Sequence, residues 1–290
     1  MKKIVDDVDE IYKIEVELLL EAVQMRYGYD FRRYSKSSIE RRLIQFMIDK
    51  NCPNLSEVMG KLLRSSTFFY ELLPYFTISV TALFRDAFFY LALREKVVPM
   101  LRTWPHFKVW HAGCATGEEA FSMAILLQEF DLLARATIYG TDISHAALET
   151  ARKGMYSLEI IKQGSTNYRQ AGGLFSLSNY YHAKYNAALL DPNLRKKITF
   201  SPHNLVIDKS FGEMQMIVCR NVLIYFNNEL QDHVLKLFAE SLEYGGYLCL
   251  GDKESLLFSS IADQFSVVDE KARIYKKIAM NDGYYQSIIV

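Results

Sequence analysis

Residues 112–119, Ala-Gly-Cys-Ala-Thr-Gly-Glu-Glu, place two glycines and two acids between an apolar run and an apolar helical pattern. Gly113 and Gly117 let the backbone turn tightly and approach a ligand closely. The free N–H groups at the start of a helix normally attract phosphate. Here Glu118 and Glu119 satisfy the positive helix end from within the protein. The stretch favours a nucleoside-type ligand that is not anionic at this point, with an ordinary strand–helix turn as the alternative.

Two further polar residues lie at expected strand ends. Asp142 follows an apolar strand pattern, where its carboxylate can accept hydrogen bonds from both ribose hydroxyls; the alternative is an N-cap for a helix over residues 144–153. Asn204 follows another strand pattern and can read an adenine edge. His203 beside it is interpreted as a structural histidine.

The segment 219–226 carries the second group with chemical potential. Arg220 and Asn221 come at the end of an expected buried strand, where polar side chains must be hydrogen-bonded or face a cleft. Tyr225 follows in an otherwise apolar turn. A cation beside an aromatic hydroxyl suits an anionic acceptor such as a carboxylate, with a structural cap of the strand end as the alternative.

The elements that must position these residues alternate between strand and helix. Because short apolar strands alternate with amphipathic helices, we expect an α/β fold with a doubly wound, mainly parallel sheet and an antiparallel edge. In such a sheet the ligand lies beyond the carboxyl ends of the strands, near the first strand–helix turn. The expected strands are 107–112, 137–141, 198–201, 214–219, 246–251, 265–268 and 272–277, and the expected helices are 118–130, 144–153, 228–242 and 254–262.

One stretch, residues 154–197, interrupts this alternation. It contains Gly164, Gly172 and Gly173 and a polar-aromatic run with partial alternation. We expect an insertion with its own short strands rather than another helical crossover.

Residues 1–76 have helical spacing of apolar residues and predict a small all-α domain. A connector with polar side chains leads into the α/β domain, 77–278, and residues 279–290 form a tail without a clear period. Between Arg26 and Lys50 there are seven Lys or Arg against three Asp or Glu. This local excess predicts either a solvated helix face or a docking surface for an acidic partner helix.

The composition restricts the class of protein. The 34 basic and 34 acidic side chains give a net charge of zero, so the chain as a whole does not indicate nucleic acid or an acidic membrane. The four cysteines form no CxxC pair, and neither a metal site nor a disulfide framework is expected. Without a signal-peptide pattern or a run of roughly 20 apolar residues, we expect a reduced, soluble, cytoplasmic protein.

Taken together, these segments resemble the CheR-type chemotaxis receptor methyltransferases, which transfer a methyl group from S-adenosylmethionine to glutamate side chains of receptor helices. The resemblance runs from about Phe31 to Lys277 and implies a Rossmann-like, class I methyltransferase domain. The segments that carry it are Thr81 with Phe84-Arg85, residues 112–119, Thr141-Asp142-Ile143, His203-Asn204-Leu205 and residues 219–226.

By this resemblance, Ser79, Thr81 and Arg85 would contact the methionine carboxylate end of S-adenosylmethionine. Glu119 would lie near its amino group, above a floor that includes Ala112 and Gly113, and Glu118 would be structural. Asp142 would hold the ribose, and Asn204 with Leu205 the adenine. Arg220 and Asn221 would border the cofactor and, with Tyr225, line the acceptor side. No metal is implied.

The resemblance also implies partners. The all-α domain, with Arg41 and Arg42, would dock on methylation helices of a chemoreceptor, and the insertion at 154–197 resembles a subdomain that grips a receptor tail in some members. We expect a monomer that binds no nucleic acid and does not insert into a membrane.

The implied reaction needs little acid–base chemistry, because a glutamate is already ionised at neutral pH and can attack the sulfonium methyl directly. Aligning carboxylate, methyl and sulfur would supply the catalysis, with Arg220 and Tyr225 positioning the acceptor. Departures from the family pattern indicate a divergent branch: Ser79 replaces the usual Asn, and residues 251–255 read Gly-Asp-Lys-Glu-Ser. The alternatives are a different protein acceptor, or a regulatory module that binds the cofactor without transfer.

Overall fold

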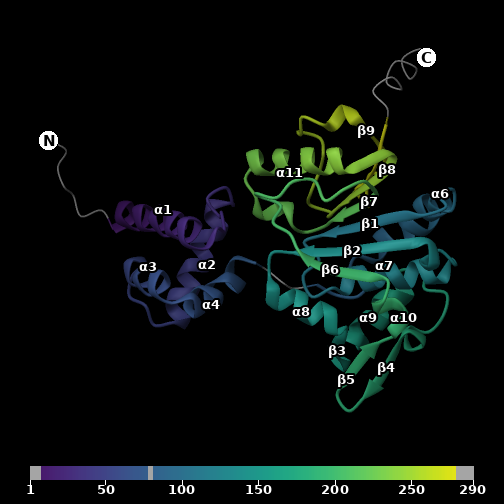
Figure 1. Ribbon diagram of the computed structural model, residues 1–290, viewed down its shortest axis with the longest axis horizontal. Coiled ribbons are helices and arrows are strands. Elements are labelled where there is room, and N and C mark those ends of the chain that lie inside the picture. Colours follow the sequence, from purple (N-terminus) through teal and green to yellow (C-terminus); the bar gives the residue numbers. More distant parts are fainter. Residues whose placement is uncertain (1–7, 78–80, 279–290) are drawn as a thin grey trace. The chain divides into compact units, whose positions relative to one another are not determined.

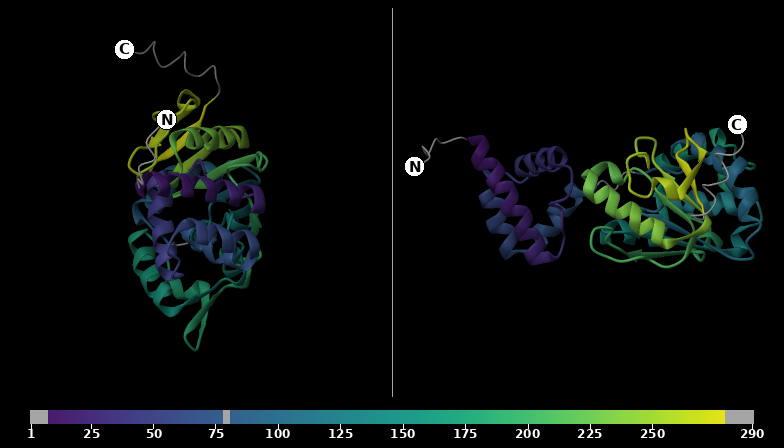
Figure 2. Two further views of the ribbon diagram at one scale, coloured as in Figure 1. Left: turned by 90° about the vertical axis from the view of Figure 1, so that its left-hand side faces the viewer. Right: turned by 90° about the horizontal axis from the view of Figure 1, so that it is seen from above.

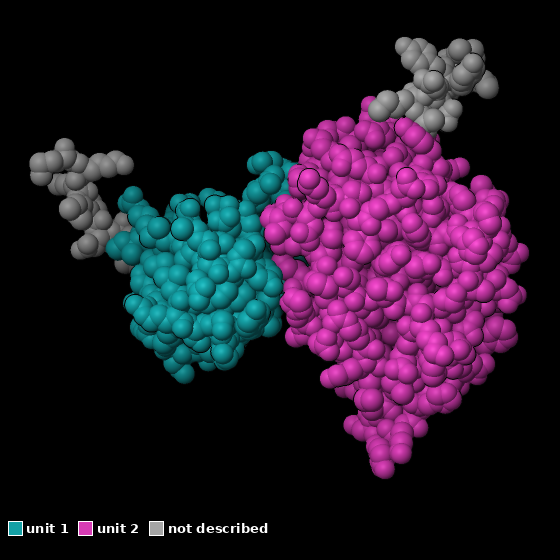
Figure 3. Space-filling model, viewed as in Figure 1, with its two compact units in different colours: residues 1–78, 225–230 teal, residues 79–224, 231–290 magenta. Residues whose placement is uncertain are grey.

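The computed structural model describes residues 8–77 and 81–278, and the chain divides into two compact units that are coloured separately in Figure 3. The first comprises residues 1–78 and 225–230, and the second residues 79–224 and 231–290. The predicted tail 279–290 and the candidate Ser79 lie outside the described residues. No helix in 8–77 or 81–278 is long and apolar enough to cross a membrane.

The first unit contains helices α1 (Val8–Tyr27), α2 (Lys36–Asp49), α3 (Leu55–Arg64) and α4 (Ser66–Phe76) (Figure 1). Side-chain caps set two of these helix starts: Asn54 Oδ1 accepts from Glu57 N at 2.8 Å, and Ser65 Oγ accepts from Phe68 N at 3.3 Å. The apolar faces meet in a core whose fully buried members include Leu19, Val23, Leu43, Phe46, Leu55, Leu62 and Phe69.

Residues 225–230 belong to this unit although they lie far along the chain. Ser35 N donates to the Tyr225 carbonyl at 2.8 Å, and Tyr34 forms an isolated antiparallel β-bridge with Phe226. Arg42 is only 7% exposed, donates to the Phe76 carbonyl at 2.7 Å and lies 4.8 Å from the centre of the Tyr225 ring. The expectation that Arg42 presents its charge to a partner is therefore wrong, because this side chain ties the unit together.

The second unit is built on a seven-stranded sheet in the order β6-β2-β1-β7-β8-β10-β9, which confirms the predicted doubly wound, mainly parallel fold (Figures 1 and 2). The first five strands in this order are parallel, and β10 is antiparallel to both β8 and β9. The strands are β1 (Phe107–Ala112), β2 (Ala136–Asp142), β6 (Ile198–Pro202), β7 (Met214–Cys219), β8 (Leu242–Leu250), β9 (Phe265–Asp269) and β10 (Ile274–Lys277).

A buried side-chain hydrogen bond links two central strands of this sheet, and helices pack against it. Trp110 of β1 is fully buried and donates from Nε1 to Thr141 Oγ1 at 2.8 Å, which joins β1 to β2. Outside the insertion at 154–197, helical segments of this unit include α5 (Ala87–Ala92), η1 (Leu93–Val97), α6 (Val98–Leu101), α7 (Glu118–Glu129), η2 (Leu133–Arg135) and α8 (His145–Lys153). The helices η4 (Leu223–Tyr225) and α11 (Asn228–Ser241) each have part of their residues in the first unit.

The insertion at 154–197 contains the expected strands, β3 (Met155–Ser157), β4 (Tyr181–Lys184) and β5 (Ala187–Leu190), as a separate sheet in the order β3-β5-β4. It also contains the helix α9 (Leu158–Gln170), which the expectation of strands alone missed. Gly164 is part of the buried face of α9, where an added Cβ would lie 2.8 Å from Leu83 Cβ. The glycine permits close packing here and does not mark a turn. The short helices η3 (Leu177–Tyr180) and α10 (Pro192–Arg195) complete the insertion.

The expectation of a helix over residues 254–262 is wrong. This segment forms turns that end in the short helix η5 (Ala262–Gln264). Two of its backbone N–H groups bond to side chains: Leu257 N donates to Ser255 Oγ at 3.1 Å, and Ser260 N to Asp232 Oδ1 at 2.7 Å. Side-chain acceptors, one local and one 28 positions away, therefore take donors that a helix would use.

Candidate functional site

The carboxyl ends of β1, β2 and β7 meet at one edge of the sheet, where the chain order reverses. β1 lies between β2 and β7, so the segments after these strands are neighbours although they are far apart in sequence. Such a reversal point is where open α/β sheets bind ligands.

The turn after β1 has the left-handed backbone that its glycines permit, with φ of 77° at Gly113 and 94° at Gly117. Close packing also requires them: a Cβ on Gly113 would lie 2.5 Å from Val222 Cγ2, and one on Gly117 2.8 Å from Ala151 Cβ. The glycines thus bring the turn against the segment after β7 and against α8.

Asp142 ends β2 with its carboxylate turned toward this turn. Oδ2 accepts from Ala115 N at 2.9 Å and Oδ1 from Ser144 N at 2.8 Å. Ser144 is the N-cap of α8, because its Oγ accepts from Ala147 N, so the capping alternative for Asp142 is wrong. Burial raises the pKa of Asp142, although the backbone donors oppose this. Each carboxylate oxygen keeps further acceptor capacity for a ligand hydroxyl.

The two acids of α7 have different surroundings. Glu118 is 2% exposed and accepts from Thr116 Oγ1 at 2.7 Å, as fits a structural side chain. The Glu119 side chain is 16% exposed; its Oε1 lies 2.9 Å from His111 Nδ1 and its Oε2 3.2 Å from Arg220 Nη1. Burial raises the pKa of Glu119, but His111 and Arg220 outweigh burial, so this pKa lies below its ordinary value.

Arg220 follows β7 and is almost fully enclosed, with 1% of its side chain exposed. Its Nη2 lies 2.6 Å from Asp86 Oδ2, and its guanidinium 4.2 Å from the centre of the Phe89 ring. Burial lowers the pKa of Arg220, but Glu119 and the other nearby acidic groups raise it above its usual value. Glu119 and Asp86 thus both contact the guanidinium of Arg220, and Asp86 Oδ2 also lies 4.0 Å from Arg85 Nε.

The connector before α5 contains two non-glycine residues in the left-handed region, Phe84 with φ 52° and Asp86 with φ 59°. Phe84 N donates to Ser122 Oγ at 2.9 Å, which anchors the connector on α7. Between these residues lies Arg85, whose side chain is 42% exposed and whose carbonyl accepts from Arg220 Nη1 at 3.4 Å. Strained backbone of this kind is concentrated at functional sites. Thr81 is half-buried at the start of this segment.

The segment after β6 carries the predicted adenine-reading residues. Asn204 Oδ1 accepts from Val206 N at 3.0 Å, which leaves its amide group as the available donor. Leu205 is 7% exposed. His203 packs edge-on against Trp110, with 5.2 Å between ring centres, and its Nε2 lies 3.1 Å from the Lys209 carbonyl. These contacts fit a structural role for His203, although its Nδ1 is buried without a hydrogen-bond partner among the described residues.

Asn221, with φ 61°, begins a loop held by a carboxylate that the sequence analysis did not single out. Glu254 is 4% exposed and accepts from the N–H groups of Asn221 at 3.1 Å, Val222 at 2.9 Å and Gly251 at 2.6 Å. Burial raises the pKa of Glu254, and these backbone donors oppose the shift.

The structure therefore brings Ala112, Gly113, Glu119, Asp142 and Arg220 to one edge of the sheet. It adds Asp86, His111 and Glu254, which sequence reasoning missed. Two of them could have been noticed in the sequence, because His111 lies inside an apolar strand and Glu254 comes shortly after a strand end. Tyr225 belongs to the helical unit, and its predicted role beside Arg220 stays a prediction.

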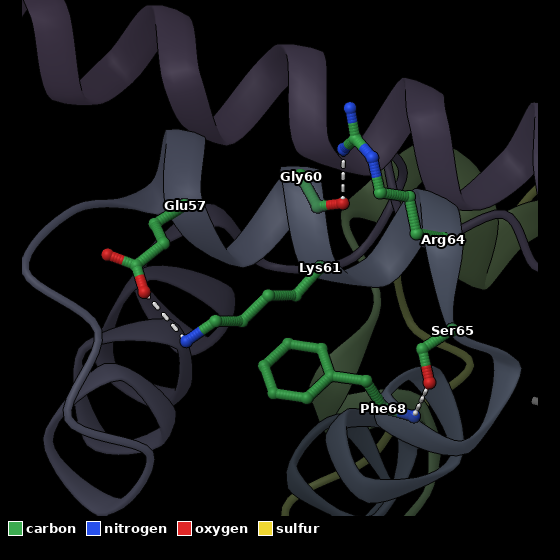
Figure 4. A pocket seen from close by; sticks show the side chains of 6 residues that line it. All are labelled: Glu57, Gly60, Lys61, Arg64, Ser65 and Phe68. Carbon is green, nitrogen blue, oxygen red and sulfur yellow. Dashed lines mark hydrogen bonds and ion pairs between the residues drawn. The ribbon is translucent and has the colours of Figure 1, made fainter.

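A hollow lies in the helical unit between α3 and α4, with a volume of about 510 Å³ (Figure 4). Its charged groups already have partners: Lys61 Nζ lies 2.7 Å from Glu57 Oε1, and Arg64 Nη1 donates to the Gly60 carbonyl at 2.6 Å. It presents no group arranged for chemistry. The lining residues are Glu57, Gly60, Lys61, Arg64, Ser65 and Phe68.

The chain is similar to several known proteins. A protein from Pseudomonas putida named "Putative methyltransferase Cher3" is 47% identical over 264 residues, which cover 91% of this chain and 97% of the relative. A "Chemotaxis protein methyltransferase" from Listeria monocytogenes is 30% identical, covering 81% and 87% of the two chains. Among solved structures, magnesium protoporphyrin IX methyltransferase from Synechocystis, with bound S-adenosylhomocysteine, has 19% identity and a TM-score of 0.31, covering 64% and 59%.

The family comparison covers nearly the whole described chain. Residues 14–77 match the all-α domain of the CheR methyltransferases, and residues 79–274 match their S-adenosylmethionine-binding domain. The second match includes every predicted cofactor-binding position, from Ser79 to Asn221. The chain therefore belongs to the CheR family of S-adenosylmethionine-dependent methyltransferases.

Proposed function

We propose that this protein methylates glutamate side chains on the helical cytoplasmic region of a chemoreceptor or a receptor-like signalling protein. Relatives named as chemotaxis protein methyltransferases, at 30% identity in Listeria monocytogenes and 28% in Pseudomonas aeruginosa, support this acceptor class. The match of residues 14–77 to the family's all-α domain supports a helical docking partner.

The observation that carries the proposal is the charge pattern at the end of β1, β2 and β7. Glu119 and Asp86 both contact the guanidinium of Arg220, Asp86 also lies beside Arg85, and Asp142 keeps acceptor capacity on both oxygens. S-Adenosylmethionine has a ribose diol, an ammonium and a sulfonium but no phosphate, so a site rich in carboxylates fits it.

We assign the cofactor contacts on this basis. Asp142 accepts from the ribose hydroxyls, and Glu119 binds the ammonium above the floor formed by Ala112 and Gly113. Asn204 and Leu205 hold the adenine. The methionine carboxylate of the cofactor binds to the connector before α5, with Ser79, Thr81 and Arg85 as its partners.

The bound cofactor supplies an electrophilic methyl group on its sulfonium. The acceptor glutamate is ionised at neutral pH, so its oxygen forms the new O–CH₃ bond as the methyl–sulfur bond breaks, and no protein base is required. Arg220, Asn221 and Tyr225 are proposed to align the acceptor carboxylate. Because Asp86 and Glu119 partly neutralise Arg220, this arginine can orient the acceptor carboxylate without strongly reducing its nucleophilicity.

The test is transfer of labelled methyl from S-adenosylmethionine to purified cytoplasmic fragments of the chemoreceptors encoded with this protein. We expect base-labile label on glutamates, lost when the acceptor glutamates are changed to Ala and lost in Asp142→Ala. Label that resists base, or label on another residue type, would contradict glutamate methylation while leaving methyl transfer intact.

A second candidate is a module that binds S-adenosylmethionine or its product and regulates a partner without transfer. The burial of Arg220 between two acids favours it, because that guanidinium has no exposed face to offer an acceptor. Tight S-adenosylhomocysteine binding with no label on any protein of a cell lysate would support this candidate.

A further inference from the structure

One residue at the site has a polarity that packing does not explain. His111 lies in β1 between Trp110 and Ala112, and its side chain is 0% exposed. Its Nε2 is buried and has no hydrogen-bond partner among the described residues. A buried polar group of this kind costs free energy, so an apolar residue would suit the strand better unless the other ring nitrogen does something specific.

That other nitrogen, Nδ1, contacts a single carboxylate oxygen, Oε1 of Glu119, at 2.9 Å. Oε2 of the same carboxylate is held by Arg220 at 3.2 Å. Arg220 in turn lies closer to Asp86, at 2.6 Å, so Glu119 is the more distant of its two acidic partners. Two contacts, from His111 in β1 and from Arg220 directly after β7, fix the orientation of the Glu119 carboxylate.

Removing the contact from β1 would leave Glu119 attached through Arg220 alone. The carboxylate could then rotate about its remaining contact, toward the guanidinium and away from the turn at residues 112–117. An imidazole suits the position because its neutral form can donate one hydrogen bond without adding a full positive charge. A lysine or arginine here would compete with a cationic ligand for the same carboxylate.

We propose that His111 is a positioning residue that orients Glu119 toward the ammonium group of the cofactor. The proposal rests on the assignment of Glu119 to that ammonium under the proposed function. His111 acts on the amino-acid end of the cofactor only, and it leaves the adenosine end to Asp142 and Asn204.

Two ligands separate this role from a merely structural one. S-Adenosylhomocysteine has the amino-acid end, whereas 5′-methylthioadenosine keeps the adenosine and the thioether but lacks it. Calorimetry with His111→Leu should show about tenfold weaker S-adenosylhomocysteine binding. Binding of 5′-methylthioadenosine should stay within about twofold. His111→Asn, which retains a donor, should recover most of the loss.

Further variants test whether His111 acts through Glu119. Glu119→Gln should also weaken S-adenosylhomocysteine selectively, and His111→Leu combined with Glu119→Gln should bind no more weakly than the weaker single variant. Asp142→Ala should weaken both ligands and serves as the control for the adenosine end. Equal weakening of both ligands by His111→Leu would overturn the proposal.

A measurement on the unmodified protein covers the case in which His111→Leu does not fold. The ¹⁵N and ¹H signals of the His111 ring should shift when S-adenosylhomocysteine binds and should not shift with 5′-methylthioadenosine. Identical shifts with the two ligands, or none with either bound ligand, would contradict the proposal. A protein that binds neither ligand would instead refute the cofactor assignments of the proposed function.

Discussion

Asp142 Oδ2 accepts a hydrogen bond from the backbone N–H of Ala115 at 2.9 Å, although the two residues are 27 positions apart. Ala115 has φ 49°, a left-handed conformation that a non-glycine residue adopts at a cost. The carboxylate at the end of β2 thus stabilises the turn after β1 while it keeps lone pairs for a ligand. The conformation of the turn after β1 and the binding of a ligand beside it therefore both depend on Asp142.

Asp142→Ala should therefore weaken S-adenosylhomocysteine binding by about 10- to 100-fold, because hydrogen bonds to a charged group and the support of the turn are both lost. Isothermal calorimetry measures this directly. Asp263→Ala, which removes an exposed carboxylate on η5, is the matched control and should bind like the unmodified protein. Equal affinities for all three proteins would remove Asp142 from the site.

Arg220→Lys keeps the charge but loses the planar fork that spans Asp86 and Glu119. We expect methyl transfer to fall at least about tenfold while S-adenosylhomocysteine affinity changes by less than about threefold. Arg220→Ala should in addition lower the free energy of unfolding by about 3 kcal/mol, because two carboxylates lose a buried counter-ion. Unchanged turnover in Arg220→Lys would show that the fork does not position the acceptor.

Glu119 should make stability depend on acid pH. Its pKa in the folded protein lies below the ordinary value of 4.5, because the contacts from His111 and Arg220 outweigh the effect of burial. The folded state therefore binds this proton less readily than the unfolded chain. The resulting stabilisation is complete above the unfolded pKa and is lost as the pH falls through the folded pKa.

Urea unfolding between about pH 5 and about pH 3 should then show a steeper fall in the free energy of unfolding for the unmodified protein than for Glu119→Gln. The two curves should differ in slope only in this acid range. Parallel curves would mean that Glu119 has the same pKa in the folded and unfolded states.

Glu254→Gln should lower the free energy of unfolding by about 2 kcal/mol, because an amide group would face backbone donors that now bind a carboxylate. Denaturant melts measure this loss. Glu270→Gln changes an exposed glutamate beyond β9 and should stay within about 0.5 kcal/mol of the unmodified protein. Equal stability of both variants would mean that Glu254 does not hold the Asn221 loop.

The two adjacent arginines of α2 should give opposite results. Arg41→Glu, at an exposed position, should weaken binding to an acidic receptor helix at low salt and leave stability nearly unchanged. Arg42→Met should lower the stability of the protein by about 2 kcal/mol, because it removes the bond to the Phe76 carbonyl and the contact with Tyr225.

Binding assays at two salt concentrations, with Lys13→Glu on α1 as an exposed reversal of the same charge, check the first result. If Arg41→Glu and Lys13→Glu bind alike, the basic face of α2 is only solvated.

The sheet was predictable from the sequence because its strands are short apolar runs, and Gly113, Asp142 and Arg220 stand at or directly after the ends of β1, β2 and β7. The turn at Gly113 and Gly117, Asp142 at the end of β2 and Arg220 at the end of β7 all follow from such local patterns. Helix α9 was missed because the glycines and the partial alternation of residues 154–197 favoured short strands, and the segment after Glu254 was misread as helical. Distant residues contact both segments: Leu83 leaves no room for a Cβ at position 164 of α9, and Asp232 accepts from Ser260 N in the turns.

The sequence alone thus determined the fold class, the family resemblance and the strand ends at which the chemistry lies, because strand periodicity and glycine turns are local properties. Only the tertiary structure decided which charges meet. Arg220 pairs with Asp86 across 134 positions, and Glu254 bonds to Asn221 N across 33. Arg42 is buried while Arg41 is exposed. Such pairings depend on the order of strands and the packing of helices, and neither is encoded in the spacing of neighbouring residues.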